Sequence, residues 1–329
     1  MRFSDILGHK REINLLKKGI ENNRCASTYL FSGLEGIGKR LVARAFAAAL
    51  NCEEYTGDAC GRCPSCTLIA SGTHPNLLLV EPEGGTLKVD LIRELKRLIN
   101  YRVDRGRRVV IIEGAHLMVR ATSNILLKTL EEPPPDTVMI LISSRPDSLL
   151  PTILSRCQRI NFSPLKEDAI KEILHREGYT EPSTIEIACR LSCGSAKRAL
   201  MMASEGIIEK RQQYTAVLSM DDVTDTELLD MAERLSKEEH LEELLESFKT
   251  LLRDALIYRV APSEERIINT DMLDAVGRCT YSVEELLSAY SLVEKTRESI
   301  LPPNTLNKRL AMEALLVSLK ERRWQGFVA

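Results

Sequence analysis

Residues 33–47 read GLEGIGKRLVARAFA, and this stretch decides the fold class. The apolar residues before it (27–33) predict a strand, and the residues that follow (39–52) predict a helix. The spacing G-x-x-x-x-G-K-[ST] of a phosphate-binding loop is matched at all but its last position. The residues of this predicted P-loop are Gly33, Gly36, Gly38 and Lys39. Such a loop directs backbone N–H groups and a helix N-terminus at a phosphate. We therefore predict a P-loop fold, with a purely structural strand–helix turn as the simpler alternative.

Two positions depart from the pattern of a P-loop that hydrolyses ATP. Arg40 stands where a Ser or Thr hydroxyl normally holds Mg²⁺, and a guanidinium there competes with the metal for space. Within the predicted strand segment 107–118, Glu113 takes the place of the metal-binding Asp, and Gly114 takes that of the water-activating Glu. Because glycine cannot activate a water molecule, we expect hydrolysis to be weak or absent. ATP or ADP is a possible ligand, and we expect its binding to be weak or absent.

The first half of the chain alternates strands and helices, which is typical of a parallel sheet. Further strands are predicted at 76–82, 107–118 and 137–146, and helices at 86–102 and 121–134. Beyond residues 160–169 the pattern is helical to the end of the chain. The predicted parts are an α/β P-loop domain with a RecA-like parallel sheet (1–164), a small helical lid domain (165–207) and an all-α C-terminal domain (208–329).

Four cysteines lie within fifteen residues, in a module (52–66) inserted after the P-loop helix. They are Cys52, Cys60, Cys63 and Cys66. Four thiolates complete a tetrahedral Zn²⁺ site without an open position, so the predicted metal is structural. An iron–sulfur cluster is favoured less, because the loop is polar and offers little apolar cover. Unligated cysteines are the remaining alternative, and the lack of a His-x-Glu motif excludes a zinc deaminase.

Composition and charge exclude several classes of protein. The chain has 329 residues and a net charge of −2, so any nucleic-acid contact must come from a local basic patch. No apolar run approaches the roughly 20 residues of a membrane span, and the N-terminus lacks the apolar region of a signal peptide. We predict a cytoplasmic protein with no membrane partner.

Together these features resemble the bacterial replicative clamp-loader family of AAA+ proteins. The likeness is greatest to the delta-prime subunits of DNA polymerase III. The related gamma/tau ATPases keep a Lys-Ser/Thr pair and an Asp-Glu pair, whereas this sequence has Lys39-Arg40 and Glu113-Gly114 at those positions. Besides the P-loop and the cysteine module, the matching segments are NILLKTLEEPPPDTVMILIS (124–143), LLPTILSRCQRINF (149–162), GSAKRAL (194–200) and LPPNTLNKRLAMEALL (301–316).

The resemblance implies roles for several residues. Ser155, Arg156 and Cys157 match the SRC motif of the family, whose arginine is an arginine finger presented to ATP in a neighbouring subunit. Arg198 matches the second sensor arginine, which faces the phosphates of its own subunit. A basic helical face is implied to contact DNA, although a solvated surface explains it equally well. Its residues are Arg93, Lys96 and Arg97.

The resemblance also implies a function. The chain is expected to be an accessory subunit of the DNA polymerase III holoenzyme that helps to load the sliding clamp onto primed DNA during replication in the bacterial cytoplasm. Implied partners are the gamma/tau ATPase subunits and the delta subunit, joined through a C-terminal collar, and the clamp and primer–template DNA through the complex. The alternatives are an active gamma/tau-type ATPase and a zinc-dependent DNA-binding protein.

Overall fold

The computed structural model describes residues 1–55, 57–101, 105–204, 208, 211, 224–263, 266–279, 281–300 and 306–325. The chain divides into two compact units, Met1–Ile173 with Gly194–Lys197, and Leu174–Cys193 with Arg198–Ala329. Parts of the predicted elements lie outside the described residues: Thr56, Arg102, 205–207 and 301–305. The division into three domains stays a prediction.

The first unit is built on a five-stranded sheet in the order β2-β3-β4-β1-β5. The strands are β1 (Thr28–Ser32), β2 (Leu77–Val80), β3 (Arg108–Ile112), β4 (Thr137–Ser143) and β5 (Gln158–Asn161). All pairings are parallel, with Leu30 opposite Leu141 and Ile111 opposite Ile140. Every residue of β1, β3 and β4 is buried, as expected for central strands covered on both faces. The predicted α/β fold of the AAA+ type is confirmed.

Strand β5 lies outside the four strands that the sequence pattern predicts. It forms an edge of the sheet, and only Ile160 of its four residues is buried. An edge strand with one buried side chain has no continuous apolar run, so the pattern gives no signal for it.

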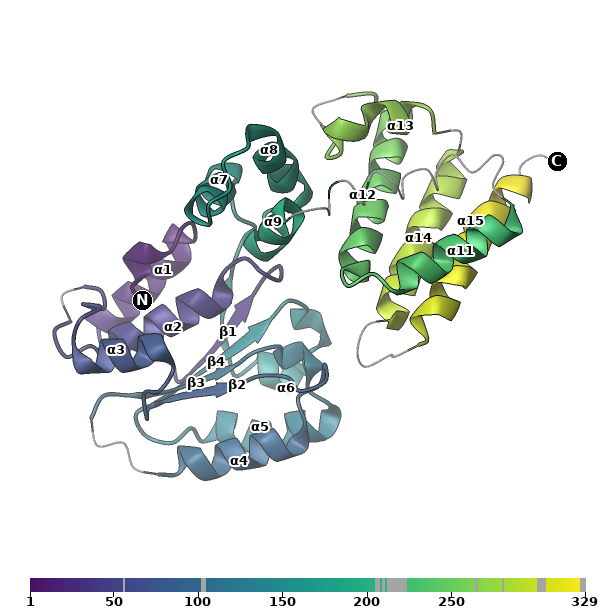
Figure 1. The fold of residues 1–329 in the computed structure, drawn as a ribbon. Helices are drawn as coiled ribbons and strands as arrows, with labels where there is room; N and C mark the ends of the chain where they lie inside the picture. The colour runs from purple at the N-terminus through teal and green to yellow at the C-terminus, as the bar shows by residue number, and fades with distance from the viewer. Residues whose placement is uncertain are drawn as a thin grey trace. The chain divides into compact units, whose positions relative to one another are not determined.

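Helices cover both faces of the sheet (Figure 1). Helices α1, α2 and α3 lie on one face, and α4 and α5 lie on the other. Their bounds are η1 (Phe3–Asp5), α1 (Lys10–Glu21), α2 (Lys39–Asn51), α3 (Pro64–Ser71), α4 (Val89–Ile99), η2 (Ala115–Leu117), α5 (Arg120–Glu131), η3 (Pro146–Ser148) and α6 (Pro151–Leu154). Apolar residues of α4, such as Ile92 and Leu95, share a buried core with Val110 and Leu141 of the sheet. The loops at the carboxyl ends of the strands, where ligands bind in open α/β sheets, therefore stand on a rigid base.

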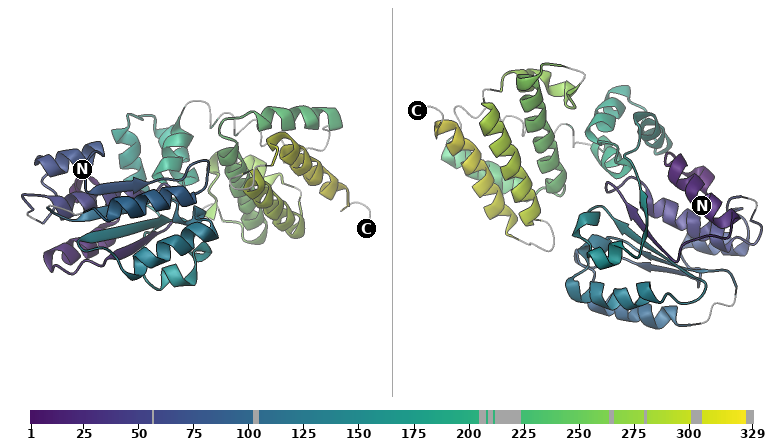
Figure 2. Two further views of the ribbon diagram at one scale, coloured as in Figure 1. Left: turned by 90° about the horizontal axis from the view of Figure 1, so that it is seen from below. Right: turned by 180° about the vertical axis from the view of Figure 1, so that it is seen from behind.

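The second unit is helical. Helices α7 and α9 cross the boundary between the units, and the others lie within the second. The bounds are α7 (Glu167–Arg176), α8 (Pro182–Leu191), α9 (Ala196–Ala203), α11 (Asp225–Ser236), α12 (Leu241–Val260), η6 (Thr270–Met272), α13 (Leu273–Gly277), α14 (Val283–Ile300) and α15 (Lys308–Gln325). Helix α14 packs between α12 and α15, as two further views show (Figure 2).

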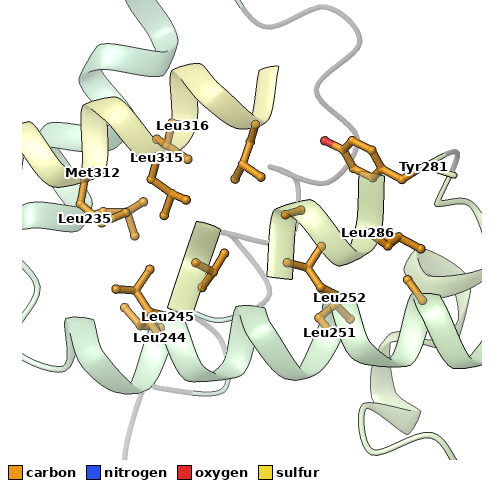
Figure 3. Close-up of a cluster of buried hydrophobic side chains, with 14 of the residues drawn as sticks. Leu235, Leu244, Leu245, Leu251, Leu252, Tyr281, Leu286, Met312, Leu315 and Leu316 are labelled. Carbon is orange, nitrogen blue, oxygen red and sulfur yellow. The ribbon is translucent and has the colours of Figure 1, made fainter. Parts of the chain in front are cut away.

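Leucines from four helices form the core of this helical bundle. Leu235 of α11, Leu245 of α12, Leu286 of α14 and Leu315 of α15 belong to one buried cluster (Figure 3). The amphipathic pattern of the C-terminal third thus produces a bundle with its own apolar core. Among the helices in the described residues, none combines the length and apolar character needed to cross a bilayer.

Candidate functional site

The predicted P-loop forms the turn between β1 and α2. Its glycines Gly33, Gly36 and Gly38 all have positive φ angles, of 144°, 75° and 98°, which side chains disfavour. At Gly36 a Cβ atom would also lie 2.5 Å from both Ser195 Oγ and Lys197 Cβ. The glycines of the motif are therefore required by backbone shape and by close packing, whether or not a phosphate binds.

Lys39, the first residue of α2, turns back into the loop. Its side chain is buried, and Nζ donates to the carbonyl oxygens of Gly33 (2.7 Å) and Leu34 (2.6 Å). Burial lowers the pKa of Lys39 to about 8, although the carboxylates of Glu35 and Glu113 act to raise it. The loop itself thus supplies partners for the ammonium group that a P-loop normally presents to phosphate.

Arg40 binds two carboxylates at the ends of neighbouring strands. Its Nη1 donates to Glu113 Oε2 (2.8 Å), just after β3, and also forms an ion pair with Glu81, just after β2. The guanidinium therefore lies against the carboxylate that was predicted to hold the metal. Sequence reasoning missed Glu81, and its position at the carboxyl end of the predicted strand 76–82 is the signal that could have found it.

Gly114 occupies the position of the water-activating glutamate in a left-handed conformation. Its φ angle is 63°, and it precedes the short helix η2. A Cβ atom there would lie 3.1 Å from Leu117 Cδ1. A glutamate at this position would be strained, so the backbone as well as the residue type departs from that of a hydrolysing site.

His116 joins the site from η2. Its Nδ1 lies 3.4 Å from Ser143 Oγ, and its Nε2 lies 3.3 Å from Ser144 Oγ. Burial and the nearby positive charge of Arg145 lower the pKa of His116. Ser143 and Ser144 therefore have a hydrogen-bonding partner within the chain.

The segment Gly194–Lys197 is bound to the P-loop by three hydrogen bonds. Ser195 Oγ donates to Glu35 O (2.8 Å), Lys197 N donates to Gly36 O (3.1 Å), and Lys197 Nζ bonds the Glu35 carboxylate (2.9 Å). Burial acts to raise the pKa of Glu35, but the hydrogen bond from Lys197 and the positive charges of Lys197 and Lys39 together outweigh it and leave that pKa lowered. The contact joins residues 160 positions apart, so no local pattern predicts it.

Arg198, the predicted sensor, follows that segment in α9. Its Nη1 lies 3.5 Å from Glu246 Oε1 of α12, within the second unit. Glu246 also pairs with Lys249 (2.9 Å) and with Arg297 of α14 (3.5 Å). Arg198 thus belongs to an ion-pair network of the helical bundle, and its sensor role stays a prediction.

The predicted SRC motif follows α6. Arg156 is about one third exposed, with its Nη2 2.8 Å from Glu131 Oε1 and its Nη1 donating to Thr152 O (2.9 Å). Ser155 Oγ also donates to Thr152 O (3.2 Å). Burial raises the pKa of Cys157 to about 11, so this thiol stays protonated and is no nucleophile. Arg156 is therefore the residue of the motif with chemistry to offer.

The four cysteines of the module converge on one point. Their Sγ atoms all lie within 4.8 Å of one another, and the Sγ atoms of Cys60 and Cys66 are 3.9 Å apart. A disulfide requires about 2.05 Å. A tetrahedral ion with Zn–S bonds of about 2.3 Å requires sulfur atoms about 3.8 Å apart. The predicted ligands Cys52, Cys60, Cys63 and Cys66 thus fit a four-coordinate metal.

Backbone amides prepare these sulfur atoms for a cation. Cys60 Sγ accepts from the amides of Arg62 (3.5 Å) and Cys63 (3.2 Å), and these bonds lower its pKa to about 7. Cys52 Sγ accepts from the amide of Cys60 (3.3 Å). Burial raises the pKa of Cys66 to about 12, so this thiolate is stable only beside a cation.

Asp58 ties the cysteine module to the start of the chain. Its carboxylate accepts from the amides of Phe3 and Ser4, both at 3.0 Å, and pairs with Lys17 Nζ at 3.4 Å. Phe3 is buried beneath the Lys17 ammonium. The module therefore holds the N-terminal residues in place.

The basic residues of α4 lie at the surface. Arg93 is exposed and pairs with Asp90 (3.1 Å), Arg97 is exposed, and Lys96 is half-buried. This geometry is compatible with phosphate contact and with a solvated helix face, so DNA contact stays a prediction.

Two family models match this chain. Residues 8–166 match "DNA polymerase III, delta subunit", and residues 205–321 match the C-terminal model of the same subunit. The DNA polymerase III subunit delta′ of Pseudomonas aeruginosa is 34% identical over 300 residues, which are 89% of this chain and 91% of that protein. The chain belongs to the delta′ family of DNA polymerase III subunits.

As a delta′-type clamp-loader subunit, the chain is also similar to the gamma/tau proteins. It is 35% identical to subunit tau/gamma of Haemophilus influenzae over 221 residues, 65% of this chain but only 32% of that protein. The chain thus spans about one third of the length of that relative. A solved structure of a gamma subunit-related protein from Thermotoga maritima is similar at 21% identity, covering 94% of this chain and 99% of that one with a TM-score of 0.45.

Proposed function

We propose that this subunit takes part in the clamp loader without hydrolysing ATP itself. The observation that carries the proposal is the pairing of Arg40 with Glu113 and Glu81. In a P-loop ATPase the corresponding region holds Mg²⁺, which neutralises the charge that develops on the phosphates. Here the guanidinium of Arg40 binds the carboxylates of Glu113 and Glu81 in that region.

Two further sets of contacts support weak or absent binding of ATP or ADP. Lys39 is bound by the loop carbonyls, and Glu35 and Gly36 are bound by the segment Gly194–Lys197. A nucleotide that entered would have to break several of these hydrogen bonds, and each broken bond costs about 1 kcal/mol. The domain keeps the shape of an ATPase, and we assign it a role in assembly.

We infer that Arg156 acts on ATP in a neighbouring gamma/tau subunit. The match to the SRC motif and the exposure of its guanidinium support this role. A guanidinium supplied in trans to a γ-phosphate can accelerate hydrolysis by about 10³–10⁵ in well-studied GTPases. The proposed complex is a cytoplasmic hetero-oligomer that includes the delta subunit, held through the helical bundle of the second unit as a collar.

We propose that the cysteine module holds a structural Zn²⁺. The separation of its sulfur atoms supports a closed tetrahedral site, which leaves no position for a substrate. Contacts to the sliding clamp and to primer–template DNA belong to the assembled complex. Arg93, Lys96 and Arg97 are the residues of this chain that we propose for phosphate contact.

The test is the steady-state ATPase rate of the reconstituted loader with clamp and primed DNA. The variants are Arg156→Ala, Lys39→Ala and, as a matched control, Arg159→Ala, since Arg159 is an exposed arginine three residues further on. We expect Arg156→Ala to lower turnover at least severalfold, while Lys39→Ala and Arg159→Ala stay within about twofold of wild type.

Either of two results would count against the proposal. A large loss with Lys39→Ala would mean that this chain hydrolyses ATP in its own site, as a gamma/tau-type ATPase does. Wild-type turnover with Arg156→Ala would remove the trans-acting role and leave a purely architectural subunit.

A further inference from the structure

We propose that Glu131 holds Arg156 against its own chain and releases it when the neighbouring subunit presents a phosphate. This inference rests on the proposed role of Arg156 in trans. It makes Glu131 a positioning residue for that arginine, and it adds a step between assembly of the complex and full activity of the neighbour's site.

The guanidinium of Arg156 is folded back in this chain. Nη1 donates to Thr152 O, four residues earlier in α6, and Nη2 pairs with the Glu131 carboxylate at the end of α5. An arginine that reaches a phosphate on another subunit needs these two nitrogen atoms for the phosphate oxygens. The conformation seen here is therefore a resting one.

The position of Glu131 is not explained by helix stability. It is the last residue of α5, and a carboxylate there faces the negative end of the helix dipole. Burial does not explain it either, because its side chain is about half exposed. The feature that does account for a carboxylate at this position is the cation that it binds, Arg156.

The strength of the pair suits a reversible hold. Both side chains are partly exposed, and ion pairs of that kind are weak and screened by salt. A triphosphate carries several negative charges and accepts hydrogen bonds at several oxygen atoms, so it competes successfully with one carboxylate. Arg156 would thus exchange one anionic partner for another without passing through an unpaired state.

Glu132 offers a matched control. It is the next residue, it is exposed, and it lies at the same end of α5. No ion pair joins it to any of the residues that the structure describes. The two glutamates therefore differ mainly in their relation to Arg156.

The experiment measures the ATPase rate of the reconstituted loader with and without clamp and primed DNA. The variants are Glu131→Gln, Glu132→Gln, Arg156→Ala and the double variant Glu131→Gln/Arg156→Ala. We expect Glu131→Gln to raise the rate without clamp and DNA by about twofold to fivefold, the factor that an exposed ion pair can supply. The increase should shrink as salt is added, and it should vanish in the double variant, which should match Arg156→Ala.

Melting temperatures of the isolated chain separate positioning from folding, and both glutamine variants should melt as wild type does. A lower ATPase rate with Glu131→Gln, or an unchanged rate, would overturn the holding role if Arg156→Ala is still damaging. An equal increase with Glu132→Gln would overturn it as well. If Arg156→Ala itself has no effect, the proposed function fails and the inference fails with it.

Discussion

The P-loop and the cysteine module are two motifs of one domain, and their functional groups differ in what they contact. In the P-loop, the charged groups find partners within the chain: loop carbonyls for Lys39, and two carboxylates for Arg40. In the module, four sulfur atoms face one another at a separation that suits a metal. The comparison teaches that a sequence motif can bind its ligand only if its ligand-binding atoms are not already bound by groups of the same chain.

The same physical rule produces both outcomes. A buried polar or charged group must be paired, because leaving it unpaired costs free energy. The P-loop satisfies the rule with protein groups, because loop carbonyls bind Lys39 and two carboxylates bind Arg40. The module cannot do so for four thiolates, because their like charges repel one another and hydrogen bonds from neutral backbone amides do not cancel those charges. We therefore expect the module to depend on a cation.

Metal removal should have the largest effect, and it tests the expectation that the cysteine module needs a metal. We expect zinc chelation, or Cys63→Ser, to lower the melting temperature by about 10 °C or more, because metal binding energy is folding energy. Loss of the module should also release the amides of Phe3 and Ser4 from Asp58. Calorimetry and metal analysis measure the first effect, and hydrogen exchange at residues 3–4 measures the second.

Cys193→Ser provides the control for that experiment, because Cys193 is exposed and distant in sequence from the module. Equal melting temperatures for metal-free and metal-loaded protein would show that internal contacts satisfy the module as well. The contrast between the two sites would then disappear.

The pH dependence of the free energy of unfolding tests whether the ammonium group of Lys39 in the P-loop is buried against groups of its own chain. The folded-state pKa of Lys39 is about 8, against 10.5 for the ordinary side chain, so the unfolded state holds more protons between these values. The contribution of Lys39 to the free energy of unfolding should therefore rise from pH 8 to pH 10.5, by at most about 3 kcal/mol. Below pH 8 the cost of burying the ammonium is present in full.

Denaturant unfolding of wild type and Lys39→Met at pH 7.5 and pH 10 measures that rise as a change in their difference. Lys18→Met, which alters an exposed lysine of α1, should give a difference independent of pH. A flat difference for Lys39→Met too would mean that the ammonium is solvated and the loop is open to ligands.

Opening the P-loop at Arg40 should have the smallest of the three effects. In Arg40→Ser, Glu81 and Glu113 lose their guanidinium and a hydroxyl replaces it. We expect the affinity for Mg²⁺ with a nonhydrolysable ATP analogue to rise about tenfold, which corresponds to about 1.4 kcal/mol. Isothermal titration calorimetry measures the change, and ATP hydrolysis should stay absent because Gly114 supplies no base.

An unchanged affinity in Arg40→Ser would place the obstruction elsewhere, at the bonds from Ser195 and Lys197 to the loop. Strong binding by wild type would be a more serious result. It would mean that nucleotide displaces Arg40, and that the site is closed only in the free chain.

Much of the fold could be predicted from the sequence. The strand and helix periods, the glycine loop and the four cysteines are all local patterns. Strands β1 to β4, the turn between β1 and α2, and the cysteine cluster formed where these patterns placed them. Strand β5 was not predicted, because an edge strand with one buried residue has no apolar run. Arg40 was predicted to compete with the metal for space. Of the two carboxylates that bind Arg40, Glu113 was singled out from the sequence and Glu81 was not.

The sequence alone determined where a phosphate loop and a metal module can form, because both depend on residues within about fifteen positions of one another. Only the tertiary structure decided what those residues bind. Arg40 meets Glu81 across 41 positions, because parallel strands bring their carboxyl ends to one edge of the sheet regardless of chain distance. Glu35 meets Ser195, in the loop before α9, across 160 positions. Charge pairing in space, which spacing along the chain does not encode, gives Lys39 and Arg40 partners within the chain and leaves four sulfur atoms at a separation that suits a metal.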